Sequence, residues 1–88
     1  MQSNNLNGRE NIMKNHTIFD YSLLKGKIKE KCGTQRNFAQ KMGLSNVSIS
    51  EKLNSKSGWT QAEICRASEI LDIAPILIES YFFKQKVK

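Results

Sequence analysis

Residues 35–54 read Gln-Arg-Asn-Phe-Ala-Gln-Lys-Met-Gly-Leu-Ser-Asn-Val-Ser-Ile-Ser-Glu-Lys-Leu-Asn, and this stretch predicts two short helices that meet at a sharp turn. Ala39 is small where the two helices must approach closely, and Gly43 can adopt a positive φ at the turn without steric cost. Apolar residues surround this corner, namely Phe38, Met42, Leu44 and Ile49. The stretch therefore predicts that the second helix, at about residues 45–54, lies exposed on the surface of its domain.

Signals for helix ends flank this pair. Thr34 and Ser45 are favourable N-caps for its two helices. Upstream, Asp20 is expected to cap a first helix, in which Phe19 and Leu24 form a hydrophobic staple. Leu24, Ile28 and Cys32 repeat every four residues and predict its buried face, and Gly33 suits its end.

The chain downstream of the pair predicts two further helices. Residues 54–58 form a loop by composition, after which Thr60 and Glu63 have the spacing of a capping box. Trp59 and Ile64 make the matching staple, and the buried positions of this fourth helix are expected to be Ile64, Ala67, Leu71 and Ile70. Pro75 fits the first turn of a short fifth helix.

The expected fold is an all-α bundle of four to five short helices with a basic C-terminal tail. A chain of 88 residues holds one small domain. We predict a flexible lead over residues 1–18, which is rich in Asn and Ser, then the helical domain over residues 19–83 and a basic tail over residues 84–88.

Charge is spread unevenly along the chain, whose formal net charge is +6. Residues 21–56 carry eight basic side chains against two acidic ones, whereas residues 57–80 carry a net charge of −3 and the tail adds +3. A basic half beside a mildly acidic half favours a polyanionic partner, which is nucleic acid, an acidic membrane surface or an acidic protein.

Several classes of protein are disfavoured. The longest apolar run, residues 73–78, is far shorter than the roughly 20 residues that span a bilayer, and the basic residues do not share a helix with a large apolar face, so we expect no membrane role. One histidine and two separated cysteines make no zinc site, and no nucleophile–base pair or phosphate loop occurs, so we expect neither enzymatic activity, cofactor nor small-molecule substrate. The expected setting is a reducing cytoplasm.

The corner resembles the helix-turn-helix of the lambda-repressor and Cro-like family. The matching residues are Gln35, Ala39, Gly43 and Ile49, and the resemblance extends more loosely over residues 21–78. One departure is Lys52, which stands where this family usually has an apolar residue, so the end of the third helix is rotated or shifted in register if the resemblance holds. The chain is also similar to small phage-encoded regulators, some of which control the lysogeny switch or bind the phage repressor.

The resemblance implies that the third helix enters the major groove of double-stranded DNA. Asn46 can pair with adenine, Val47 packs either on a thymine methyl or in the core, and Glu51 accepts from cytosine or is solvated. The residues implied at base edges are Ser45, Asn46, Val47, Ser48, Ser50 and Glu51. Those implied at phosphates are Thr34, Gln35, Arg36, Lys52, Asn54, Lys56 and Ser57.

The main hypothesis is thus a sequence-specific DNA-binding transcriptional regulator, expected as a homodimer on a two-fold operator. The candidate dimer or partner contacts are Ile76, Tyr81, Phe82, Phe83 and Val87, although each aromatic ring can instead pack on its own domain. The alternative hypothesis is a protein-binding modulator, which docks the same helix pair onto a phage repressor and keeps it from DNA.

Overall fold

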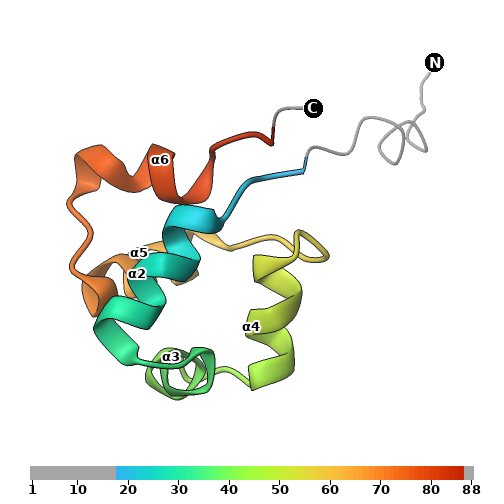
Figure 1. The fold of residues 1–88 in the computed structure, drawn as a ribbon, viewed down its shortest axis with the longest axis vertical. Helices are drawn as coiled ribbons and strands as arrows, with labels where there is room; N and C mark the ends of the chain where they lie inside the picture. The colour runs from blue at the N-terminus through green and yellow to red at the C-terminus, as the bar shows by residue number, and fades with distance from the viewer. Residues whose placement is uncertain (1–17, 87–88) are drawn as a thin grey trace.

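Five α-helices and one short 3-10 helix follow one another in the computed structural model, which describes residues 18–86 (Figure 1). They are α2 (Ser22–Cys32), α3 (Gln35–Met42), α4 (Asn46–Leu53), α5 (Gln61–Leu71), η1 (Pro75–Leu77) and α6 (Ile78–Phe82). The predicted all-α bundle is confirmed. Within residues 18–86 no helix is long and apolar enough to cross a membrane.

Three of the predicted helix caps are confirmed. The Asn37 amide donates to Thr34 Oγ1 at 3.0 Å at the start of α3, and the Ser48 amide donates to Ser45 Oγ at 3.0 Å at the start of α4. Thr60 and Glu63 form a complete capping box at α5, with bonds of 3.1 and 2.9 Å. Local side-chain chemistry therefore sets where these helices begin.

The start of α2 differs from the prediction. Tyr21 occupies the N-cap position without a side-chain cap, and Asp20 lies one residue ahead of it. The Asp20 carboxylate instead accepts hydrogen bonds from the Ser22 hydroxyl at 2.6 Å and the Ser22 amide at 2.9 Å, which lower the pKa of Asp20. The helix therefore begins one residue later than predicted, and Tyr21, which is 6% exposed, lies in the core.

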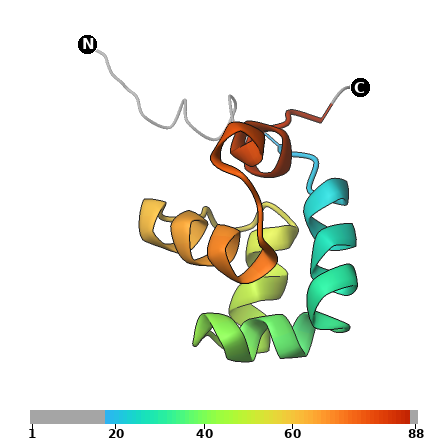
Figure 2. The ribbon, with the colours of Figure 1, turned by 90° about the vertical axis from the view of Figure 1, so that its left-hand side faces the viewer.

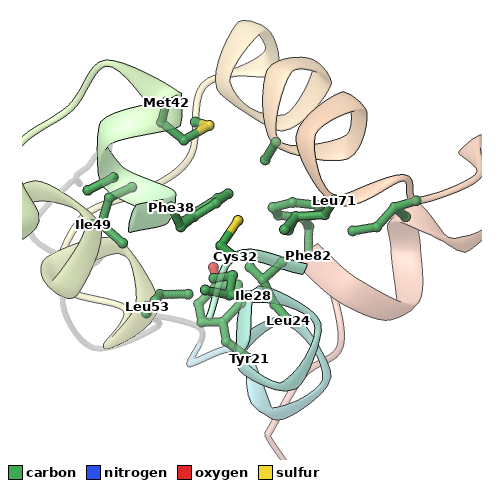
Figure 3. Packing of buried hydrophobic residues seen from close by; sticks show 13 residues of the cluster. Tyr21, Leu24, Ile28, Cys32, Phe38, Met42, Ile49, Leu53, Leu71 and Phe82 are labelled. Atoms are coloured by element: carbon green, nitrogen blue, oxygen red, sulfur yellow. The ribbon is translucent and has the colours of Figure 1, made fainter. Parts of the chain in front are cut away.

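Helix α2 contacts α3, α5 and α6. In Figure 2 it runs along one side of the bundle, with α6 near its beginning and α3 at its end. Leu24, Phe38, Ile49 and Leu71 are fully buried and come from four different helices (Figure 3). Phe82 lies among them and is 1% exposed, so it packs in the core of its own domain and is not the partner contact that the sequence predicts.

The two ends of the described chain are joined to each other. The Asp20 amide donates to the Lys84 carbonyl at 2.7 Å, and the Lys86 amide donates to the Ile18 carbonyl at 2.9 Å. Phe19 and Gln85 between them form an isolated antiparallel bridge. The first residues of the expected tail thus pair with the segment that leads into α2, whereas the lead over residues 1–17 and the end of the tail, residues 87–88, lie outside the described residues.

Candidate partner-docking surface

Helix α4 lies along one side of the bundle, and none of the other described elements covers its outer side (Figure 1). Gly43 makes the turn before it with φ 75°, in the left-handed region. The Leu44 amide donates to the Ala39 carbonyl at 3.0 Å and closes the corner, where Ala39 is buried. The corner that the sequence predicts from Ala39 and Gly43 therefore holds α4 against α3.

The outer face of α4 carries few charges. Val47 is 66% exposed, Asn46 and Glu51 are exposed, and Ser48 and Ser50 are half-buried. Lys52 is the one basic residue of α4, and it is buried on the other face. The surface that α4 presents is therefore polar, with one aliphatic side chain and one negative charge.

Lys52 lies inside the bundle, 9% exposed, and the assignment of this residue to a phosphate contact must be corrected. Its ammonium group donates to the Gly58 carbonyl at 2.9 Å, lies 2.9 Å from Glu63 Oε1 and lies 5.9 Å from the centre of the Trp59 ring. Leu53 beside it is also buried. The end of α4 thus buries both residues. Lys52 can occupy a position that is usually apolar because Glu63 and the Gly58 carbonyl satisfy its ammonium group.

Glu63 completes this ion pair from the first turn of α5. Burial acts to raise the pKa of Glu63, but the hydrogen bond from the Thr60 amide and the adjacent Lys52 ammonium together lower it. The carboxylate therefore stays charged, and one side chain both caps α5 and neutralises Lys52. The pair ties the end of α4 to the beginning of α5.

The other residues predicted at phosphates lie in two groups. Gln35 is half-buried and lines a hollow of about 250 Å³ with Lys25, Lys29 and Leu53, next to the exposed Arg36. Thr34 shares this wall, but its hydroxyl already caps α3. Asn54 donates to the Ser50 carbonyl at 2.9 Å, and Lys56 and Ser57 are exposed in the loop that follows α4.

The residues predicted as dimer or partner contacts differ in exposure. Ile76 is 87% exposed in η1, and Phe83 is 49% exposed just after α6. Tyr81 is half-buried against the core, Phe82 is buried, and Val87 lies outside the described residues. Of this set, Ile76 and Phe83 are the ones that the structure presents as large exposed apolar side chains.

An apolar hollow on the surface of the bundle was not predicted from the sequence. A hollow of about 310 Å³, here called the Trp59 hollow, is lined by Phe19, Tyr21, Ser55, Lys56, Ser57, Gly58, Trp59, Ile64, Phe82 and Phe83. The Trp59 and Phe82 rings meet edge to face with their centres 5.3 Å apart, and Phe19 and Phe83 do so at 6.2 Å. Phe19, Trp59 and Ile64 appear in the sequence as staple residues, which is the signal that each lies near a helix start, but nothing local shows that they meet.

Titratable groups around these sites make no metal centre: over residues 18–86, no group of three or more His, Cys, Asp or Glu side chains is placed to hold an ion. Cys32 is buried in the core and Cys65 is exposed on α5.

Comparison with solved structures finds a relative. The solution structure of the modulator of repression (MOR) of the temperate bacteriophage TP901-1 from Lactococcus lactis is similar to this chain, with a TM-score of 0.69 and 53% sequence identity. The match covers 80% of this chain and 95% of that one. Among curated proteins, no relative matches.

This similarity corrects the main functional hypothesis, because the relative is described as a modulator of repression. The prediction of a sequence-specific DNA-binding transcriptional regulator is wrong, and the alternative of a modulator is favoured. Among the basic residues implied at phosphates, Lys52 is buried whereas Arg36 and Lys56 are exposed, so the correction rests on the relative and not on the charge of this surface. The resemblance to the Cro-like family and the homodimer stay predictions.

The sequence also matches the model of a protein family. The model described as "Protein of unknown function (DUF739)" matches residues 17–85. This range takes in every helix of the described structure and more than half of the chain. The chain therefore belongs to the DUF739 family.

Proposed function

We propose that this protein binds a phage repressor through the outer face of α4 and thereby changes the binding of that repressor to DNA. The proposal gives it a binding role and no catalytic one. The observation that carries it is the exposed Val47 on a helix without an exposed basic residue, in a chain 53% identical to a phage modulator of repression.

The composition of this face fits a protein partner better than a nucleic acid. An exposed aliphatic residue surrounded by Asn46, Ser50 and Glu51 resembles the apolar anchor and polar rim of a protein interface. Glu51 repels phosphates but can pair with basic side chains, and the surface of a repressor that binds DNA is necessarily rich in them. A partner that covers that surface competes directly with the operator.

Basic side chains on the neighbouring helix add to this fit. Arg36 and Lys41 are exposed on α3, the helix that contacts α4. Lys41 lies beside the corner at Gly43, and Arg36 lies at the other end of α3. They favour acidic side chains on the partner at the edge of the contact, where charges mainly raise the rate of association and fix the orientation. The expected repressor surface is therefore basic where it meets Glu51 and acidic around it.

The test compares Val47→Asp with Ile76→Asp, a matched change at an exposed apolar position on η1. Binding to the repressor of the same phage is measured by calorimetry, and release of the repressor from its operator by gel shift. We expect Val47→Asp to weaken both by at least about tenfold, as for an interface anchor, and Ile76→Asp to change neither. Unchanged binding by Val47→Asp, with a helical circular dichroism spectrum, would contradict the proposal.

A further inference from the structure

The Trp59 hollow is apolar, and three separate parts of the chain build it. Phe19, Tyr21, Trp59, Ile64, Phe82 and Phe83 form its wall, and residues 55–58 form its rim. Its volume of about 310 Å³ is at the lower end of the roughly 300–1,000 Å³ typical of binding pockets. That volume holds one bulky side chain and the backbone next to it, and it is too small for a whole helix.

Hydrogen bonds within the chain hold the rim of this hollow in place. The amides of Lys56 and Ser57 donate to the Glu51 carbonyl at 2.8 and 3.4 Å and fold the loop back on the end of α4. The Ser55 hydroxyl bonds to both the amide and the carbonyl of Phe19 at 3.4 Å, which links the rim to the opposite wall. A wall held in this way loses little conformational entropy on binding.

Charge around the hollow is positive. Lys56 is the one charged residue that lines it. The neighbouring hollow, which shares Phe19, Tyr21 and Ser55 with it, is also lined by Lys25 and Lys86. Asp20 lies in that second hollow too, so the two hollows together are lined by three lysines and one carboxylate. An apolar wall with lysines at its edge selects an apolar group that carries negative charge beside it.

We propose that the Trp59 hollow is a second docking site, which binds an acidic peptide segment of a partner protein by one bulky apolar side chain. The side chain packs against Trp59 and Phe83, and the flanking carboxylates of the segment pair with Lys56 and Lys86. The site lies beyond the C-terminal end of α4 and does not use the outer face of that helix. It can therefore exist whether or not that face binds a repressor.

Trp59 is the one tryptophan of the chain, so its fluorescence reports directly on this hollow. The probe is the capped hexapeptide Glu-Asp-Phe-Leu-Glu-Asp, titrated into the full-length protein, and the comparison peptide has lysine at every acidic position. We expect a saturable change in Trp59 emission with the acidic peptide and binding at least about fivefold weaker with the lysine peptide. Several ion pairs, each worth up to about 1 kcal/mol, produce a difference of this size.

Variants separate this site from the rest of the surface. Phe83→Ser and Lys56→Glu are each expected to weaken the acidic peptide at least about threefold, whereas Lys31→Glu, a charge reversal on α2 away from the hollow, and Val47→Asp on α4 leave it unchanged. Loss of peptide binding in Val47→Asp would overturn the proposal that the hollow is a separate site. If Val47→Asp loses repressor binding and keeps peptide binding, the two sites are separate, as proposed.

Three results would overturn the proposal. The first is the absence of a saturable change with the acidic peptide, and the second is equal affinity for the two peptides. The third is tighter peptide binding after Ile12→Ser and Met13→Ser in the full-length chain, which would mean that the protein's own N-terminal segment is the occupant.

Discussion

The inner face of α4 carries Ile49, Lys52 and Leu53, all buried, whereas its outer face carries Asn46, Val47 and Glu51, all exposed. Each face holds one residue of the type expected on the other, because Lys52 is charged and inside while Val47 is aliphatic and outside. Lys52 is explained by the partners that it finds within the fold. Val47 makes no such contact within the fold of residues 18–86, and a single exposed aliphatic side chain is common on protein surfaces. The similarity to a phage modulator of repression is what makes Val47 a candidate partner contact.

The largest expected effect separates the two faces by stability. Ile49→Ala removes a fully buried side chain and should lower the free energy of unfolding by about 3 kcal/mol, the usual range for such a cavity. Val47→Ala should leave it within about 0.5 kcal/mol, since Val47 is exposed and alanine favours helix. Urea unfolding followed by circular dichroism measures both. Similar losses in the two variants would mean that α4 has no free face.

The contrast also shows how far the sequence could predict this molecule. The three caps at Thr34, Ser45 and Thr60 depend on contacts within four residues, so the sequence predicts them and with them the helix order. The direction of the Lys52 side chain depends on Glu63 and on the Gly58 carbonyl. These groups come close only once the loop has folded. The family resemblance marks position 52 as usually apolar, but it does not reveal these partners, and Lys52 is therefore among the implied phosphate contacts.

The Trp59 hollow could not be predicted from the sequence either, because its residues meet only in the folded chain. Phe19, Trp59 and Phe83 are far apart along the chain, and their meeting depends on the pairing of residues 18–20 with residues 84–86. From the sequence, each aromatic residue at positions 81–83 can either pack in the core of its own domain or contact a partner. The packing around α2 decides between them, since Phe82 is buried and Phe83 is exposed.

A second prediction concerns the charge on the inner face. Glu63→Gln keeps an oxygen that can cap α5 but removes the negative charge from Lys52, whose side chain is 11% exposed. We expect the free energy of unfolding to fall by about 1–2 kcal/mol, because a buried ammonium group is left with uncharged partners, such as the Gly58 carbonyl and the Trp59 ring. Adding Lys52→Met should recover part of this loss. A double variant less stable than Glu63→Gln would show that Lys52 does not need the charge.

The smallest and most specific effect is the pH dependence of the stability that Glu63 contributes through its charge. The folded protein lowers the pKa of Glu63 from its ordinary value of 4.5, so the charged carboxylate favours the folded state. Its contribution is complete above that pH and is lost as the pH falls through the folded pKa. The stability difference between wild type and Glu63→Gln should therefore be largest near neutral pH and shrink in acid. Asp20, whose pKa is also lowered, titrates equally in both proteins and cancels from the difference.

Val47→Ala supplies the control for this titration, because the outer face has no part in the ion pair. Its stability difference from wild type should stay constant over the pH range in which the effect of Glu63→Gln disappears. A Glu63→Gln difference that also stays constant in acid would mean that neither the Thr60 amide nor the Lys52 ammonium group favours the charged carboxylate. In that case the inner face of α4 tolerates a lysine by the Gly58 carbonyl and the Trp59 ring, which lies 5.9 Å from the ammonium group, without help from the opposite charge.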